Sequence, residues 1–294
     1  MKKKSYVLLQ GGLGNQMFQY AFYLAIKRIN PNIECDCSIV KYYNDHNGFE
    51  LENIFNIKVQ QSKLTFCISK ILNRYTFLQK KRIESYTGFK LIKDSIPSIY
   101  MPKLLKEQKH FRTYYLGYWQ TESYFNHIAY DIRKKFKFDE SKLSDESRLV
   151  AKEIQTNTSV SIHIRRGDYL LDKNINLYGS ICTIEYYNKA ISLIQNKHPE
   201  CHFYIFSDDY EWVKKNLQIN RNVTYINFNK GKDSWQDMYL MSLCKHNIIA
   251  NSSFSWWGAW LNSNPNKIVI CPSKFINSNS KSDIIPENWL TIEV

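Results

Sequence analysis

The chain has 294 residues, a length that suits two compact domains or one large α/β domain. Its 44% hydrophobic and 23% charged residues are ordinary for a globular protein, so disorder, collagen and coiled coil are excluded. The net charge of +13 favours an anionic partner, which leaves phosphate groups, nucleic acid and membrane surfaces open.

Cysteine usage and hydrophobic runs both indicate a cytoplasmic location. The seven cysteines form no C-x-x-C pair, which fits a reducing compartment better than a disulfide framework or structural zinc. The amino-terminal lysines precede an apolar run of only residues 6–9, too short for a signal peptide. Residues 246–266 lack Asp, Glu, Lys and Arg, but their Asn, Ser and Gly content excludes a membrane span.

Basic residues are concentrated in one quarter of the chain. Residues 63–137 contain 16 Lys and Arg against 5 Asp and Glu. This charge favours peripheral contact of the region with anionic lipid or lipid-diphosphate acceptors at the inner face of the plasma membrane. Because the same region is rich in tyrosine, a basic nucleic-acid-binding protein is the alternative from another functional class.

The first half is predicted to begin with a strand, a turn and a helix. Residues 6–10 are expected to form a strand, residues 11–14 a glycine-rich turn, and Asn15 the N-cap of a helix that ends near Ile29. A second strand is predicted over 33–38, and a strand and a helix over 114–119 and 123–136.

The second half alternates strands and helices after a polar boundary within residues 139–158. Strands are predicted over 160–164, 202–206, 223–226, 247–250 and 267–270, and helices over 183–197, 208–216, 234–245 (capped by Ser234) and 253–261. Such alternation requires right-handed crossovers and a parallel, doubly wound sheet. We therefore predict an α/β fold with domains over 1–150 and 151–294, the last residues packing back on the first domain.

In a doubly wound sheet, ligands bind beyond the carboxyl ends of the strands. Three of the predicted strands end in residues suited to a site: Arg165-Arg166-Gly167-Asp168, Ser207-Asp208-Asp209 and Asn251-Ser252-Ser253. The loop over 227–231 follows another strand. A cluster of cations, carboxylates and small hydroxyls at these ends predicts a binding pocket.

The segment from His163 to Asp168 is the sharpest of these motifs. Strand alternation places His163 and Arg165 on the same face. The planar donors of arginine match phosphate oxygens and stay charged at any working pH. Asp168 can act as a base, orient Arg166, or form only a surface ion pair.

The other motifs each have a functional and a structural interpretation. Asp208 and Asp209 can accept from a ribose or guanine, or cap a helix. Because the chain has no Asp-x-Asp motif, we expect no metal, and the phosphate charge falls to Arg165 and to helix N-termini. Residues 251–254 can cap a helix or bind phosphate, whereas the tryptophans that follow are expected in the core. Residues 11–16 match a dinucleotide fingerprint only in part, because the third glycine is missing.

Four sequence blocks together resemble the α-1,2-fucosyltransferases of glycosyltransferase family 11. They are residues 11–20, 163–169, 206–209 and 251–257. The resemblance implies a GT-B architecture with two facing Rossmann-like domains, the second of which holds the nucleotide. It also implies metal-independent, inverting transfer of L-fucose from GDP-β-L-fucose to the 2-hydroxyl of a terminal β-galactose. The acceptor would be an oligosaccharide or a lipid-linked glycan, and the enzyme a bacterial, cytoplasmic one of O-antigen or capsule biosynthesis.

The resemblance also implies roles for individual residues. Arg165 would bind the β-phosphate and stabilise departing GDP, with Asp168 and Asn15 as the other catalytic candidates. The implied donor-binding residues are Gly12, Leu13, Gly14, His163, Arg165, Ser207, Asp208, Asp209, Asn251, Ser252, Ser253 and Phe254. Among these, His163 and Asp208 would contact guanine, and Ser252 and Ser253 would contact the diphosphate. Gly12 and the catalytic candidate Asn15 would lie near the glycosidic oxygen. A fucosyltransferase of another linkage, such as α-1,6, is the alternative within enzymes.

Overall fold

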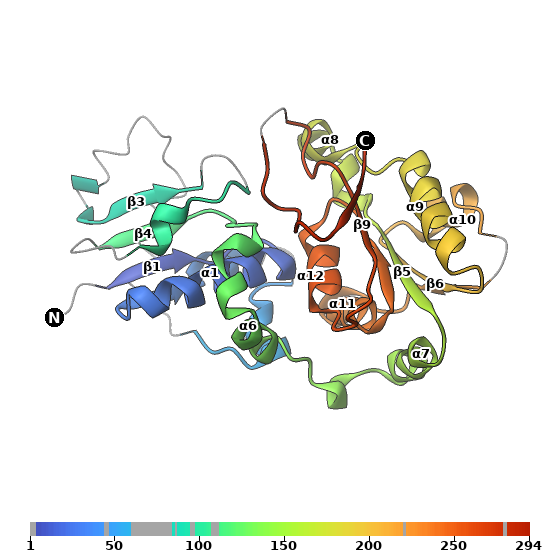
Figure 1. The fold of residues 1–294 in the computed structure, drawn as a ribbon. Coiled ribbons are helices and arrows are strands. Elements are labelled where there is room, and N and C mark those ends of the chain that lie inside the picture. Colours follow the sequence, from blue (N-terminus) through green and yellow to red (C-terminus); the bar gives the residue numbers. More distant parts are fainter. Residues whose placement is uncertain are drawn as a thin grey trace. The chain divides into compact units, whose positions relative to one another are not determined.

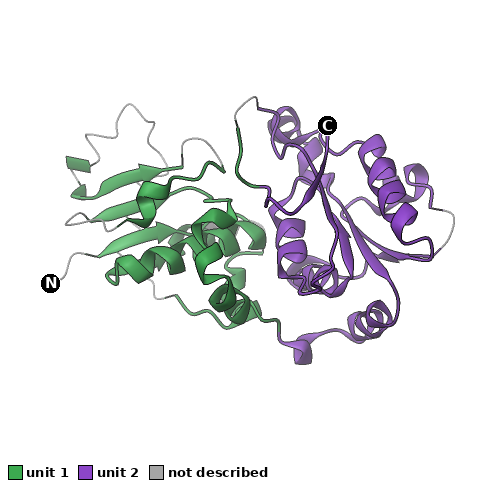
Figure 2. Ribbon diagram, in the orientation of Figure 1, with its two compact units in different colours: residues 1–138, 281–284 green, residues 139–280, 285–294 purple. Residues whose placement is uncertain are grey.

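The structure, a computed structural model, describes residues 4–43, 47–59, 84–85, 87–94, 98–106, 112–219, 222–278 and 281–294. The chain divides into two compact units (Figure 2). Unit 1 comprises residues 1–138 and 281–284, and unit 2 residues 139–280 and 285–294. The division therefore falls at residue 139 rather than 150, because α7 (Asp145–Thr156) packs against α11 (Trp235–Leu243) of unit 2. Residues 63–83, 86, 95–97 and 107–111 of the basic region lie outside the described residues.

The described part of unit 1 contains a parallel sheet of four strands in the order β2-β1-β4-β3. The strands are β1 (Ser5–Leu8), β2 (Ile33–Asp36), β3 (Lys90–Lys93) and β4 (Thr113–Leu116). The helices described here are α1 (Leu13–Ile29), α2 (Ser38–Tyr43), α3 (Glu50–Phe55) and α6 (Ala129–Lys135), with short 3₁₀ turns at Pro102–Leu105, Glu122–Tyr124 and Asn126–Ile128.

Two local predictions for unit 1 are wrong. Gly12, not Asn15, is the N-cap of α1, and no side-chain hydrogen bond is made from this cap position. The predicted helix over 123–136 is instead two 3₁₀ turns followed by the shorter α6. The strand β3 was not predicted, because its four residues alternate too briefly to give a periodic signal.

Unit 2 contains a six-stranded parallel sheet in the order β10-β9-β8-β5-β6-β7. Figure 1 labels β5, β6 and β9 of this sheet. Its strands are β5 (Ser159–Ile164), β6 (His202–Ser207), β7 (Val223–Ile226), β8 (His246–Ile248), β9 (Val269–Pro272) and β10 (Leu290–Ile292). Counted from β5 along the chain, this is the 3-2-1-4-5-6 order of a Rossmann fold. The α/β prediction with a doubly wound parallel sheet is confirmed.

The helices of unit 2 follow the predicted alternation, with additions. Besides α7 and α11, they are α8 (Asp172–Tyr178), α9 (Ile184–Lys197), α10 (Tyr210–Asn216) and α12 (Ser253–Leu261), with 3₁₀ turns at Glu140–Lys142, Gly167–Leu170 and Gly231–Asp233. Ser234 precedes α11 but makes no side-chain cap hydrogen bond, contrary to the prediction. α7, α8 and β10 were not predicted, and β9 ends at Pro272 rather than at residue 270.

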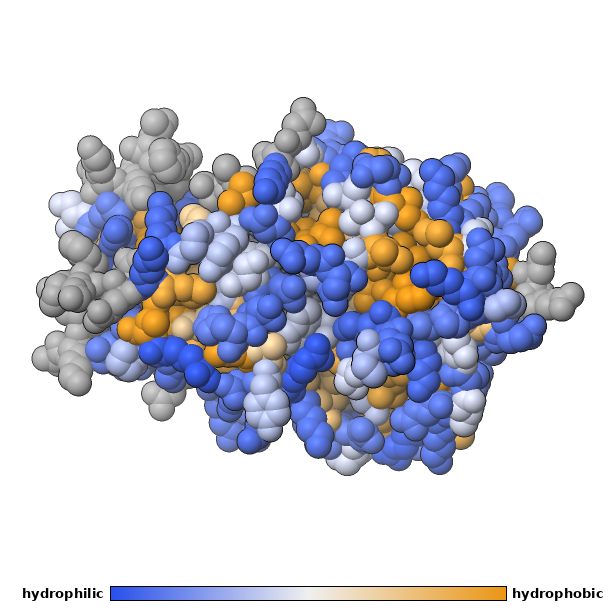
Figure 3. Space-filling view, in the orientation of Figure 1, coloured by the Kyte–Doolittle hydropathy of each residue, from blue (hydrophilic) through white to orange (hydrophobic). Residues whose placement is uncertain are grey.

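The core of unit 2 lies between its sheet and the helices that cover it. α9 buries Ala190 and Ile194 against β5 and β6, whose strand residues are themselves buried. The tryptophans of α12, Trp256, Trp257 and Trp260, are at most 4% exposed, which confirms their assignment to the core. On the face shown in Figure 3, hydrophilic side chains cover most of the described surface, and apolar side chains gather in smaller separate areas.

The described cysteines are all free thiols, and five of the six are buried. Within the described residues, none of the helices combines the length and the hydropathy that a membrane span requires.

Candidate functional site

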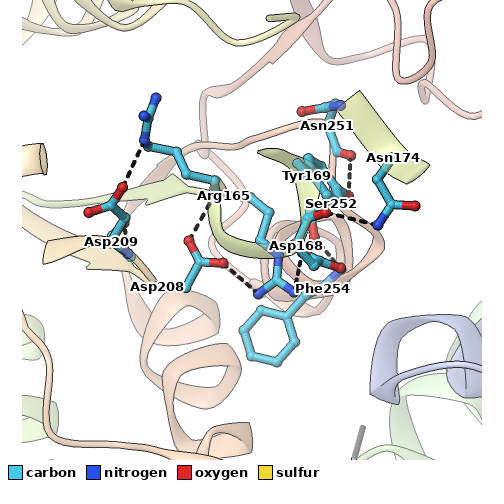
Figure 4. A network of polar contacts seen from close by, with 11 residues as sticks. Arg165, Asp168, Tyr169, Asn174, Asp208, Asp209, Asn251, Ser252 and Phe254 are labelled. Atoms are coloured by element: carbon cyan, nitrogen blue, oxygen red, sulfur yellow. Dashed lines mark hydrogen bonds and ion pairs between the residues drawn. The ribbon is translucent and has the colours of Figure 1, made fainter. Parts of the chain in front are cut away.

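The reversal of strand order in unit 2 defines where a ligand would bind. β5 leads outward to β6 and β7, whereas β8 on its other side leads to β9 and β10. The crevice beyond the carboxyl ends of β5 and β8 is the topological switch point, at which open α/β sheets bind ligands. The segments after these strands, together with the end of β6, bring the predicted residues together (Figure 4).

Arg165 lies at the centre of this site, held between two carboxylates. Its Nη2 lies 2.7 Å from Oδ1 of Asp168, and its Nη1 lies 3.0 Å from Oδ2 of Asp208 (Figure 4). The side chain keeps 31% of its surface exposed. A guanidinium held in position yet open to solvent can contact an anionic ligand without a large loss of side-chain entropy.

Asp208 connects β6 to the segment after β5. Its Oδ1 accepts a hydrogen bond from the backbone amide of Arg166 at 2.9 Å. A Cβ atom on Gly167 would lie 2.7 Å from its Oδ2, closer than a Cβ atom approaches another heavy atom without a shift of one of them. Gly167 is therefore required for this close approach and not only for a turn.

Arg166 has partners of its own on the α10 side of the site. Its Nε donates to Oδ2 of Asp209 at 3.0 Å, and its guanidinium lies 3.8 Å from the centre of the Trp212 ring. The interpretation that Asp168 orients Arg166 is thus wrong, because Asp168 contacts Arg165. Asp209 also caps α10 by accepting from the amide of Trp212, so its predicted capping role is confirmed. Ser207 lies in the same turn, where its hydroxyl accepts from the amide of Asp209.

His163 precedes this cluster on β5 and is 6% exposed. Burial, with the nearby charge of Arg165, lowers the pKa of its imidazole to about 3, so the ring is neutral at physiological pH. Its ring centre lies 5.8 Å from that of Phe254, and its Nδ1 has no hydrogen-bond partner among the described residues. A neutral, buried nitrogen of this kind is suited to a hydrogen bond with an uncharged ligand group.

The segment after β8 divides into structural and accessible residues. The Asn251 amide donates to the carbonyls of Tyr178 and Phe275, so this side chain holds the loop. The Ser252 hydroxyl caps α12 by accepting from the amide of Phe254. Ser253 is partly exposed at the first turn of α12, where helix N-termini favour anions.

Tyr169 also belongs to this site, although no role was predicted for it. Its hydroxyl donates to the carbonyl of Asn251 at 3.0 Å and interacts with the Ser252 side chain. Burial raises the pKa of Tyr169, and its ring stacks on that of Tyr178 at 5.0 Å. It links the segments after β5 and β8. Its position at the end of the block 163–169, directly after the Arg165–Asp168 motif, was the sequence signal for it.

The remaining predicted residues belong to unit 1, at the start of α1. The Asn15 side chain accepts from Nε2 of Gln120 at 2.8 Å. Gly12 is partly exposed, whereas Leu13 and Gly14 are buried. The amide of Leu13 donates to the carboxyl group of Glu50, so this helix N-terminus already has an acceptor within the chain. This contact argues against the interpretation of residues 11–16 as a dinucleotide loop that binds phosphate.

Across the described ranges, no group of three or more His, Cys, Asp or Glu side chains is arranged to hold a metal ion. The acidic residues of the unit 2 site are instead paired with arginines.

Comparison with known protein families decides the class of this site. The model of glycosyl transferase family 11 matches residues 1–293. The chain belongs to glycosyltransferase family 11. This membership makes the chain a glycosyltransferase. It disfavours the alternative that the chain is a basic nucleic-acid-binding protein.

Two family 11 relatives match over nearly their whole length. An α-1,2-colitosyltransferase of Escherichia coli is 36% identical, covering 97% of this chain and 97% of the relative. The O-antigen biosynthesis glycosyltransferase WbnK of Escherichia coli is 33% identical, covering 98% of this chain and 100% of the relative. A human galactoside α-(1,2)-fucosyltransferase 1 is 26% identical over a segment that covers 47% of this chain and 40% of the relative.

Solved structures show the same fold at much lower identity. The crystal structure of fucosyltransferase NodZ from Bradyrhizobium superposes with a TM-score of 0.51 at 11% identity, covering 88% of this chain and 92% of that one. The fold of the family 11 chain is therefore that of GT-B glycosyltransferases, as the resemblance implied.

Proposed function

We propose that this family 11 enzyme transfers L-fucose from GDP-β-L-fucose to the 2-hydroxyl of a terminal β-galactose, with inversion at the anomeric carbon. The observation that carries the proposal is the match, over 97% of both chains, to an α-1,2-colitosyltransferase. The more distant galactoside α-(1,2)-fucosyltransferase shares the linkage and names the galactoside acceptor. The shared α-1,2 linkage favours this product over an α-1,6-linked one.

The residues of unit 2 suit the donor half of such a reaction. Breaking the bond between sugar and phosphate leaves negative charge on GDP. Arg165, already held by Asp168 and Asp208, can exchange one carboxylate for a β-phosphate oxygen and stabilise that charge. The first turn of α12, where Ser253 is partly exposed, offers backbone amides to the same diphosphate. His163, neutral and with a free ring nitrogen, and Asp208 are the residues proposed to contact guanine.

We propose further that no metal cofactor takes part in the transfer. The fixed positive charge of Arg165 then replaces a divalent cation at the leaving group. The measurement is turnover with and without EDTA. Loss of activity in EDTA that Mg²⁺ or Mn²⁺ restores would contradict this proposal.

GDP-colitose is the second candidate donor, because the same relative is named for colitose. Colitose differs from fucose by the absence of the 3-hydroxyl. An enzyme that hydrogen-bonds this hydroxyl should reject colitose strongly, whereas an enzyme with an apolar surface there accepts both sugars. The ratio of kcat/KM for the two donors distinguishes these cases.

The acceptor is proposed to be an oligosaccharide or lipid-linked glycan, reached at the inner face of the plasma membrane. Exposed lysines of unit 1 support peripheral contact with anionic lipid; those described include Lys103, Lys134, Lys135 and Lys137. Co-sedimentation with liposomes should rise with their anionic lipid content. Equal binding to neutral liposomes would contradict the contact.

The central experiment measures donor binding and transfer separately. GDP at about 100 times its dissociation constant should stabilise the fold by about 2.7 kcal/mol, visible as a rise in Tm. GDP-fucose and GDP-colitose are then incubated with lactose, Gal-β1,3-GlcNAc and Gal-β1,3-GalNAc, and the products are analysed for linkage by mass spectrometry. Absence of α-1,2-linked product with every pair would contradict the proposed function.

A further inference from the structure

The two groups of unit 2 that suit a diphosphate come from separate segments of the chain. Arg165 directly follows β5, whereas the first turn of α12, with Ser253, lies after β8. A diphosphate that contacts both groups gains most when their spacing is already correct, because ordering mobile groups on binding costs free energy. A contact between the two segments is therefore needed to set this spacing.

Tyr169, in the 3₁₀ turn Gly167–Leu170, contacts both segments. Its hydroxyl donates to the carbonyl of Asn251 at 3.0 Å and interacts with the side chain of Ser252, the N-cap of α12 (Figure 4). The guanidinium of Arg165 lies 5.8 Å from the centre of the Tyr169 ring, within the range of a cation–π interaction. One side chain thus reaches both the start of the helix and the arginine.

Tyr169 is itself held on two sides. Its ring stacks on that of Tyr178, at the end of α8, with ring centres 5.0 Å apart and planes inclined by 24°. The carbonyl of Tyr178 accepts from the side chain of Asn251 at 3.2 Å, and the carbonyl of Asn251 accepts from the hydroxyl of Tyr169. These three residues form a closed set of contacts, so a shift of one displaces the other two. Burial raises the pKa of Tyr169, so its hydroxyl keeps its proton and remains a donor.

A buried ring nitrogen that lacks a partner lies beside the same helix start. The ring centre of His163, a residue that is 6% exposed, lies 5.8 Å from that of Phe254 in the first turn of α12. Its Nδ1 has no hydrogen-bond partner among the described residues. An unsatisfied buried polar atom in a folded protein calls for an explanation, such as a bound molecule. The spacing that Tyr169 sets is therefore that of a place where a ligand is expected.

We propose that Tyr169 is a positioning residue that fixes the spacing between Arg165 and the first turn of α12, so that both contact one diphosphate. This inference rests on the proposed function, because it requires a nucleoside diphosphate at this site. Tyr169 acts through its contacts with the two segments and does not touch the reacting atoms. A ligand with a single phosphate needs only one of the two groups, so the spacing matters for GDP and not for GMP.

The test compares Tyr169→Phe with Tyr204→Phe in the binding of GDP and GMP, measured by calorimetry. Tyr169→Phe keeps the ring beside Arg165 and removes the hydroxyl that holds Asn251. We expect it to weaken GDP binding by about fivefold to tenfold and GMP binding by less than about twofold. Tyr204 is the matched control, because it is a buried tyrosine of β6 whose hydroxyl donates to Glu153 at 3.0 Å. Tyr204→Phe should leave both affinities unchanged even where it lowers Tm as much.

Kinetics and a second variant separate positioning from a loss of folded enzyme. Tyr169→Phe should raise KM for GDP-fucose by about fivefold or more and leave the acceptor KM within about twofold of the wild type. A loss of folded enzyme would instead lower kcat and leave both KM values unchanged. Tyr178→Leu removes the ring that stacks on Tyr169, and it should lower the ratio of GDP to GMP affinity in the same direction.

Three results would overturn the assignment of Tyr169. They are a ratio of GDP to GMP affinity that is equal in Tyr169→Phe and the wild type, an equal change of this ratio in Tyr204→Phe, and a wild type that binds GDP no more tightly than GMP. A wild type that binds GDP but forms no α-1,2-linked product would contradict the proposed function alone, because the affinity ratio is measured without an acceptor.

Discussion

The backbone at Gly167 passes so close to Asp208 that a Cβ atom there would lie 2.7 Å from the Asp208 carboxylate. The two residues come from segments after different strands, β5 and β6. Their contact lets Asp208 reach the amide of Arg166 and the guanidinium of Arg165 together. The position of the arginine thus depends on the absence of a side chain two residues away.

Gly167→Ala should displace Asp208 and weaken both contacts. Because hydrogen bonds to charged groups contribute about 1.5–3 kcal/mol, we expect at least a roughly tenfold loss of GDP affinity, measured by calorimetry. Gly88→Ala is the control, because Gly88 has a φ of 68° and open space around its Cβ position. It should lower Tm through backbone strain and leave GDP affinity intact. Equal affinity in Gly167→Ala and wild type would show that the contact is dispensable.

Arg165→Lys preserves the charge but removes the planar fork of donors. A lysine has one ammonium group, which cannot keep the geometry that Asp168 and Asp208 share with the guanidinium. We expect kcat to fall by about 10²-fold or more in Arg165→Lys and further in Arg165→Ala. The Tm of both variants should stay close to that of the wild type. Arg148→Lys is the control, because Arg148 forms an exposed ion pair with Asp145, and it should leave kcat unchanged. Turnover of Arg165→Lys within a fewfold of wild type would remove the guanidinium from the mechanism.

Elements with strong local signals were predicted well from sequence. The bounds of β7 and α12 agree with the prediction, because each is a largely apolar segment between polar residues. The cluster around Arg165 was predicted because parallel topology alone brings strand ends together. Short elements such as β10 were missed, since three residues carry no measurable period.

Pairings between distant residues could not be derived from the sequence. Glu50, 37 positions after Leu13, binds the start of α1, where Asn15 had been expected to act. Likewise Asp209, and not the nearer Asp168, pairs with Arg166. Such choices depend on how strand ends are spaced in three dimensions.

Asp209 both caps α10 and pairs with Arg166, and two substitutions separate these contributions. Asparagine is as good an N-cap as aspartate, so Asp209→Asn should lose only the ion pair, worth about 0–1 kcal/mol at this partly exposed position. Asp209→Ala loses the cap as well and should lower the free energy of unfolding by about a further 1 kcal/mol. Urea denaturation followed by tryptophan fluorescence measures both. Equal losses in the two variants would contradict the cap assignment.

Asp237 makes the stability of unit 2 depend on pH. It lies in the first turn of α11, and Asn229 donates to its Oδ1 at 2.8 Å. Burial raises the pKa of its carboxyl to about 7, well above its ordinary value near 4. Between pH 4 and pH 7 the folded state therefore binds more protons than the unfolded state, so this group lowers stability progressively as pH rises.

Asp237→Asn removes this titration while keeping an oxygen for Asn229 to bind. The variant should match the wild type at pH 4.5 and exceed it in Tm by about 2–4 °C at pH 8, since the wild type must then hold a buried charge. Asp145→Asn, whose side chain is 92% exposed, is the control and should show no such divergence. A Tm difference between Asp237→Asn and wild type that stays constant from pH 4.5 to pH 8 would mean that Asp237 is ionised throughout. Its burial would then be offset by contacts other than the one with Asn229.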